Sequence, residues 1–120
     1  MRRCLLVVDD EKLVRWTIEQ CMNKEAFRVL SASSVMEALG KLEKEQVDVI
    51  ITDLVMPELS GIEMARRAKT IRPATKIIMM TAYGTLLDRQ EARQAGISRF
   101  IEKPFLITDV KNVVSQVLAE

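Results

Sequence analysis

The stretch CLLVVDDE, residues 4–11, decides the fold of this 120-residue chain. Five apolar residues run without a break, and three acidic residues, Asp9, Asp10 and Glu11, follow at once. A short, fully apolar run is typical of a strand that is covered on both faces, as in a parallel sheet. It is too short for a membrane span or a secretory signal, so we expect a cytoplasmic protein without membrane contact.

Four further runs of this kind follow, and segments with helical periodicity separate them. We predict strands at 4–8, 27–32, 47–52, 76–81 and 99–102. The first four are apolar nearly throughout and suit covered strands, whereas the last is mixed and suits an edge. The alternation predicts an α/β fold of the (βα)5, flavodoxin-like class: a doubly wound, five-stranded parallel sheet of order 2-1-3-4-5. Right-handed crossovers then bring every strand's carboxyl end to one edge of the sheet.

Hydroxyl residues mark the starts of the predicted helices. Each stands three positions before an acidic residue, which is capping-box spacing: Ser34 with Glu37, Ser60 with Glu63, and Thr85 with Asp88. The apolar faces of the first and last helices are formed by Leu13, Val14, Ile18, Cys21 and Met22, and by Val110, Val113, Val114, Val117 and Leu118. Both faces should pack on the sheet.

Two glycines fall at different places in this pattern. Gly96 follows the fourth helical segment and is expected to cap it. Gly40 lies inside the second helical segment, where glycine costs about 1 kcal/mol relative to alanine, and no sequence pattern explains it.

Composition excludes several classes of chemistry. There are 18 basic and 17 acidic residues, so the net charge of +1 gives no electrostatic reason for direct nucleic-acid binding. The chain has no histidine, which excludes a Ser-His-Asp triad and any histidine metal ligand. Cys4 and Cys21 are expected to be reduced thiols without a chemical role. Carboxylates, lysine and hydroxyls must carry any chemistry.

Residues of these types stand at the ends of the predicted strands. Asp9 and Asp10 follow the first strand, Asp53 the third, Thr81 ends the fourth, and Lys103 lies just past the fifth. The topology brings them together at one edge. Crowded carboxylates repel one another unless a hard dication such as Mg²⁺, or Mn²⁺, lies among them. With a phosphoryl donor, Asp53 can then act as the nucleophile while Lys103 neutralises the transferring oxygens, which gives an acyl phosphate.

The same residues carry a resemblance that covers the whole chain, 1–120. The motifs VVDDE (7–11), TDLVMP (52–57) with Gly61, MTA (80–82) and KPF (103–105) stand in the order and spacing of a CheY-like receiver domain of bacterial two-component signalling. The RW pair at 15–16, with the motifs around Thr81 and Lys103, looks most like the receivers of nitrogen-regulation transcription activators.

The resemblance implies a role for each site residue. Asp53 would be the phosphoacceptor, Asp10 a direct ligand of the metal ion, and Asp9 a ligand through water. The backbone carbonyl of Val55 would complete the protein ligands. Thr81 and Lys103 would contact the phosphoryl oxygens.

The resemblance also implies a switch and a backbone feature. Phe100 would swing inward when Thr81 moves toward the phosphoryl group, and the peptide bond between Lys103 and Pro104 would be cis. Val55 and Tyr83 flank the implied phosphoryl site, and neither can orient an attacking water, so we expect slow loss of the phosphoryl group.

A receiver of this kind implies a phosphoryl donor and an output partner, and it needs no external substrate. The chain lacks histidine, so the phosphohistidine donor must be a sensor histidine kinase or a phosphotransfer protein. The output surface would be the fourth helix, fifth strand and fifth helix, through which the protein could form a homodimer or contact a C-terminal effector domain that controls transcription. The domain would modify itself rather than act as an enzyme on an external substrate.

Three alternatives use similar features. A pseudo-receiver would signal by contact alone, but the complete acidic pocket with Lys103 argues against it. A phosphatase with an aspartate nucleophile needs a second acid where Val55 stands. A flavin-binding domain needs a hydroxyl-rich phosphate loop after the first strand, where the acids would repel the anion.

Overall fold

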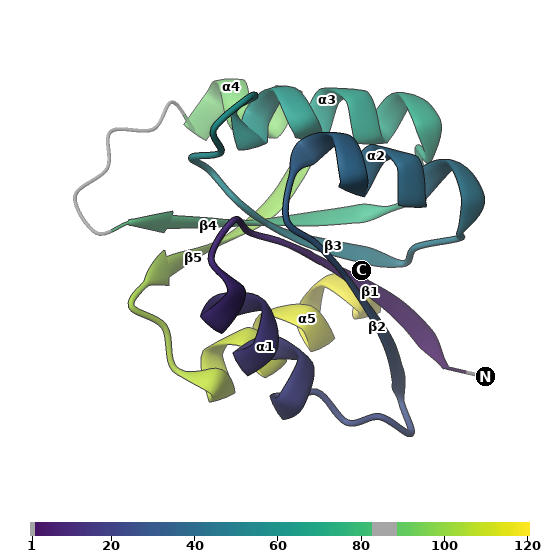
Figure 1. Cartoon of the computed structure of the whole chain (residues 1–120), viewed down its shortest axis with the longest axis vertical. Helices are drawn as coiled ribbons and strands as arrows, with labels where there is room; N and C mark the ends of the chain where they lie inside the picture. Colours follow the sequence, from purple (N-terminus) through teal and green to yellow (C-terminus); the bar gives the residue numbers. More distant parts are fainter. Residues whose placement is uncertain (1, 83–88) are drawn as a thin grey trace.

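The fold is a parallel sheet between two layers of helices, described for residues 2–82 and 89–120 by a computed structural model (Figure 1). The strands are β1 (Arg3–Val8), β2 (Phe27–Ala32), β3 (Val49–Asp53), β4 (Lys76–Ala82) and β5 (Ile97–Lys103). All of their pairings are parallel, in the order β2-β1-β3-β4-β5. The predicted fold class and strand order are confirmed.

The helices alternate with the strands along the chain. They are α1 (Lys12–Cys21), α2 (Val35–Lys44), α3 (Gly61–Ile71), α4 (Arg89–Gln94) and α5 (Ile107–Ala119). Helices α1 and α5 cover one face of the sheet, and α2, α3 and α4 cover the other (Figure 1). None of the helices in the described part of the chain has the length and apolar character needed to cross a bilayer.

The two faces of the sheet build two separate apolar clusters. Alternate residues of one strand point to opposite sides, so Leu6 packs with the cluster under α2, α3 and α4, and Leu5 packs with the cluster under α1 and α5. Both side chains are fully buried. The central strands are therefore rigid supports for whatever stands at their carboxyl ends.

One detail of the sequence prediction holds only in part, and another is wrong. Strand β2 packs against both apolar clusters, as expected, but five of its six residues are only partly buried at this edge of the sheet. Leu13 was expected to pack on the sheet, yet 70% of its surface is exposed. Val14 and Ile18 supply the face of α1 that meets the sheet, and Leu13 is turned away from it. The mixed strand at 99–102 does form an edge, within β5.

The predicted capping signals can be followed at two helices. The hydroxyls of Ser34 and Ser60 accept hydrogen bonds from the amides of Glu37 and Glu63, each at 3.2 Å. Gly96 adopts a φ of 99°, which confirms its capping role because residues with a Cβ rarely reach that region. The third predicted pair, Thr85 with Asp88, lies outside the described residues.

Candidate functional site

The site lies at the carboxyl edge of the sheet, where β1 and β3 run side by side. Val8 is paired with Thr52 there, so Asp9 and Asp53 leave neighbouring strands at the same level. Gly61 allows the start of α3 to come close, because a Cβ at this position would lie 2.5 Å from the Asp53 carbonyl oxygen. The Gly61 amide donates to the Leu54 carbonyl at 2.7 Å and fixes this turn.

Three carboxylates meet at this edge. One oxygen each of Asp9, Asp10 and Asp53 lie within 4.8 Å of one another. Asp9 is fully buried and Asp53 is largely buried, whereas Asp10 is exposed to solvent. Three acids gathered this closely form a donor set of hard oxygen atoms, which is the set that Mg²⁺ prefers.

Lys103 enters this acidic cluster from the end of β5. Its ammonium donates to Oδ2 of Asp9 at 3.0 Å and lies 3.5 Å from Oδ2 of Asp53. The peptide bond between Lys103 and Pro104 is cis, as predicted. The lysine stands 94 residues after Asp9, so the contact depends on the fold and not on local sequence.

Burial and charge act against each other at the two central groups. Burial raises the pKa of Asp53, the Lys103 ammonium opposes the shift, and the Asp9 carboxylate adds to it, so the net direction is upward. Burial lowers the pKa of Lys103, but the hydrogen bond to Asp9 and the nearby carboxylates outweigh it and raise the value. The lysine therefore stays charged, while the acids remain in excess.

Asp9 is held by several contacts besides Lys103. Its Oδ1 accepts the amide of Glu11 at 2.8 Å, and its backbone carbonyl accepts a guanidinium hydrogen bond from Arg15 at 2.7 Å. Both Asp9 oxygens are thus already engaged within the protein. Asp10 shows no hydrogen bond or ion pair to any residue within 2–82 and 89–120, so its carboxylate is the more available ligand.

Thr81, Val55 and Phe100 complete the set of predicted residues. Thr81 is the next-to-last residue of β4 at the same edge, is 5% exposed, and is paired in register with Glu102. The Val55 side chain is exposed, and its amide stabilises the charged form of Asp53. Phe100 is partly buried, and the Arg89 guanidinium lies over its ring at 4.4 Å from the centroid. Tyr83 lies outside the described residues.

Sequence reasoning missed Glu11 and Arg15. Glu11 reaches within 3.8 Å of the Lys103 ammonium, and Arg15 contacts the backbone of Asp9. Arg15 lies on α1 four residues after Glu11, which directly precedes that helix, and this spacing could have indicated that both face the site. Nothing in the sequence indicated that Glu11 would lie near the Lys103 ammonium together with Asp9 and Asp53.

A groove with apolar walls adjoins the acidic cluster between α1 and the segment after β5. It encloses about 470 Å³. Its lining residues are Glu11, Leu13, Val14, Thr17, Lys103, Pro104 and Phe105. The exposed Leu13 therefore stands at a groove that opens beside Lys103.

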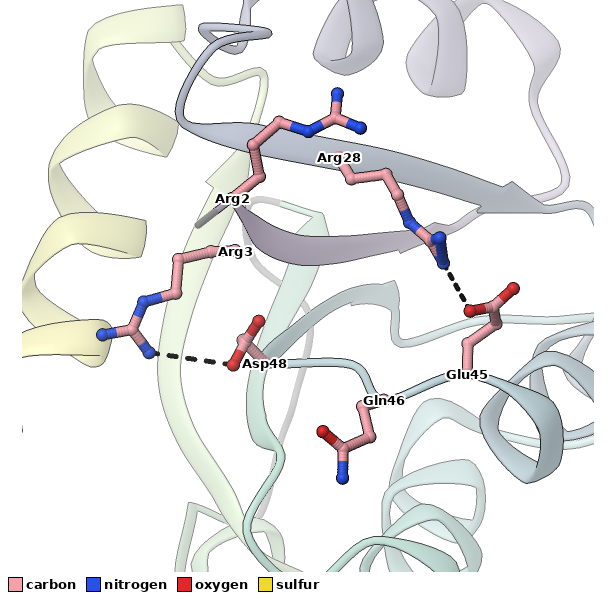
Figure 2. Close-up of a pocket in the computed structure, with 6 residues that line it drawn as sticks. All are labelled: Arg2, Arg3, Arg28, Glu45, Gln46 and Asp48. Carbon is pink, nitrogen blue, oxygen red and sulfur yellow. Dashed lines mark hydrogen bonds and ion pairs between the residues drawn. The ribbon is translucent and has the colours of Figure 1, made fainter.

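A larger hollow, of about 690 Å³, lies at the opposite, amino-terminal edge (Figure 2). Figure 2 shows the arginines there pointing away from one another, with Arg3 directed at Asp48 and Arg28 at Glu45. Arg3 and Arg28 are paired with these acids, and the Arg2 guanidinium donates to the Lys24 carbonyl at 3.4 Å, so this hollow offers no convergent group for catalysis. Among the described residues, the carboxyl edge is where the acids and Lys103 converge.

Comparison with known proteins identifies the family of this chain. Residues 5–115 match the family described as response regulator receiver domain. The chain is 33% identical over 118 residues to sporulation initiation phosphotransferase F of Bacillus subtilis (strain 168), covering 98% of this chain and 95% of that protein. It is 32% identical to the DNA-binding transcriptional regulator NtrC of Azospirillum brasilense, covering 95% of this chain but 24% of that protein.

A solved structure has the same architecture. The response regulator receiver domain protein (CheY-like) of Methanospirillum hungatei JF-1 superposes with a TM-score of 0.92. The two sequences are 28% identical, and the match covers 99% of this chain and 95% of the other.

Proposed function

We propose, from the premise that this chain belongs to the response regulator receiver domain family of two-component signalling, that Asp53 accepts a phosphoryl group. The observation that carries the proposal is the position of its carboxylate. It lies in an acidic cluster with Asp9 and Asp10, and 3.5 Å from the Lys103 ammonium. An oxygen nucleophile, a cation-binding donor set and a fixed positive charge therefore meet at one point.

The step is an in-line displacement at phosphorus. An oxygen of Asp53 forms a new P–O bond, while the P–N bond of a donor phosphohistidine breaks and the imidazole leaves with the electron pair and takes a proton. In this proposal, Lys103 and the Thr81 hydroxyl contact the phosphoryl oxygens. A bound Mg²⁺ or Mn²⁺ would neutralise charge on the transferring oxygens. This cation would be held directly by Asp10, Asp53 and the Val55 carbonyl, and through water by Asp9.

The donor is a sensor histidine kinase or a phosphotransfer protein, and the groove beside Lys103 is the surface that receives it. Leu13 lines this groove and is 70% exposed, and Trp16, on the same helix α1, is 56% exposed. Apolar side chains of this size at a groove are typical of protein contacts. A donor seated there would bring its phosphohistidine to Asp53.

Phosphorylation of Asp53 changes the conformation of a second surface, through which the domain passes on the signal. Thr81 and Phe100 form the switch, and α4, β5 and α5 form the face that responds, through a homodimer or an effector domain. Residues 1–120 act as one receiver domain. Its downstream response is control of transcription, as the name of the NtrC relative suggests. It is a signalling domain and not an enzyme on an external substrate.

The experiment is phosphorylation by a small donor. The protein is incubated with Mg²⁺ and acetyl phosphate, and intact mass is measured over time. We expect one phosphoryl adduct on the wild type. The adduct should be absent from Asp53→Asn and should not form when a chelator removes the cation.

Asp48→Asn provides the matched control, because it removes the same charge at the opposite edge of the sheet. This variant should be labelled as readily as the wild type. An unlabelled wild type would contradict the proposal and favour a pseudo-receiver that signals by contact alone. Labelling that persists in Asp53→Asn would place the acceptor elsewhere.

A further inference from the structure

Glu11 stands at the outer rim of the site. It is the residue before α1, where a side chain ordinarily caps the helix, but its carboxylate makes no capping hydrogen bond. It reaches instead to 3.8 Å from the Lys103 ammonium. Its side chain is 66% exposed, against 0% for Asp9 and 14% for Asp53. Glu11 is thus the solvent-facing member of the group of acids around Lys103.

Its position places it on the path of an incoming donor. Glu11 lines the groove that also contains Leu13, Phe105 and Lys103. Any phosphoryl group that reaches Asp53 from this side passes its carboxylate. Because the acids already outnumber the lysine, another negative charge at the rim adds repulsion for an anion and does nothing to neutralise it.

We propose that Glu11 is a specificity-determining residue that selects phosphoryl donors by charge. Its carboxylate slows small dianionic donors, which have no contacts with the groove to hold them against this repulsion. A protein donor is held by apolar contacts in the groove and is less affected. Labelling of the domain by free acyl phosphates is thereby slowed. This inference rests on the proposed phosphorylation of Asp53.

Two small donors of different charge test the selection. Acetyl phosphate is a dianion near neutral pH, and phosphoramidate is a monoanion. Acetate leaves the first and ammonia the second, each with the bonding pair, and both transfer the phosphoryl group to Asp53. The second-order rate constant is measured for each donor by intact mass, at low and at high ionic strength.

Glu11→Gln removes the charge and keeps the length of the side chain. We expect the acetyl phosphate rate constant to rise about threefold at low salt, with a smaller rise for phosphoramidate, because an exposed charge acts through a screened field. High salt should reduce the difference between the variant and wild type. The ratio of the two rate constants is the readout, since a purely structural change would alter both donors alike.

Glu11→Asp is the rescue variant, because it restores the charge at the rim, and it should return the ratio to the wild-type value. Glu43→Gln, an exposed acid on α2, is the control for net charge and should leave the ratio unchanged. Calorimetric titration with Mg²⁺ alone should give similar affinities for wild type and Glu11→Gln. Each reaction is run at saturating Mg²⁺.

Two results would overturn the inference. An unchanged ratio in Glu11→Gln would show that the rim charge does not select donors, while labelling of the wild type would leave the function of Asp53 intact. Loss of Mg²⁺ binding in Glu11→Gln would make the residue part of the cation site instead. If the wild type accepts a phosphoryl group from neither donor, the proposed function itself fails.

Discussion

The two edges of the sheet arrange their charges in opposite ways. At the amino-terminal edge, Arg3 faces Asp48 and Arg28 faces Glu45, so the two acids there each have a partner of opposite sign (Figure 2). At the carboxyl edge, carboxylates gather within 4.8 Å of one another around Lys103. Paired charges need no ligand. Crowded like charges cost stability, and a bound cation would offset that cost.

The largest effect should come from removing the positive charge at the crowded edge. Lys103→Met should slow labelling by acetyl phosphate about a hundredfold, because the phosphoryl oxygens lose a fixed charge partner. The rate constant at saturating Mg²⁺ measures this. Lys111→Met, an exposed lysine on α5, is the matched control and should react normally. A Lys103→Met protein that reacts as fast as wild type would show that the lysine has no part in the transfer.

At the amino-terminal edge, removal of a charge should destabilise the fold and leave the chemistry alone. Oδ2 of Asp48 accepts the Cys4 amide at 2.7 Å. Asp48→Ala leaves that amide without its partner and should lower the free energy of unfolding by about 1–2 kcal/mol in urea denaturation.

Asp48→Asn separates the hydrogen bond from the ion pair. It keeps an oxygen acceptor for the Cys4 amide but loses the ion pair with Arg3. That ion pair is exposed and contributes less to stability than the hydrogen bond. Asp48→Asn should therefore be milder than Asp48→Ala. Both variants should accept the phosphoryl group like wild type, and a slowed reaction would mean that the two edges are not independent.

Removing a charge at the carboxyl edge should have the opposite effect on stability and raise the free energy of unfolding. Asp53 has a raised pKa in the folded state, so its stabilising contribution is present at low pH and is lost as the pH rises through that value. At neutral pH without divalent cations, Asp53→Asn should therefore be more stable than wild type by about 1 kcal/mol.

Two dependences check the origin of this gain. The advantage of Asp53→Asn should grow as the pH rises from the acidic range to neutrality, and it should shrink when Mg²⁺ is added, because the cation stabilises the wild type more. Urea denaturation in chelator and in Mg²⁺ gives both. If Asp53→Asn is the less stable protein in chelator at neutral pH, crowding of carboxylates is not a cost in this fold.

The sequence predicts the fold and the composition of the site because both depend on periodicity and strand ends. Apolar runs at regular intervals predict the strands, and parallel topology alone brings Asp9, Asp53 and Lys103 to one edge. The cis peptide before Pro104 followed from the family resemblance. These features require no knowledge of side-chain rotamers.

The remaining features depend on packing that periodicity does not encode. Leu13 fits the apolar face of a helix by spacing, but it stands beside the groove, away from the sheet. The contact of Glu11 with Lys103 joins distant segments through flexible side chains. Gly40 still has no structural reason, since a Cβ there would meet no atom within 4 Å.

The most direct test is to locate the bound cation. Substoichiometric Mn²⁺ is added to ¹⁵N-labelled protein, and the loss of amide signals is mapped and then reversed with Mg²⁺. The amides around Asp9, Asp10 and Asp53 should broaden, and those around Glu45 and Asp48 should stay sharp. Broadening centred on Glu45 and Asp48, or spread over the whole surface, would contradict the assignment of the cation to the carboxyl edge.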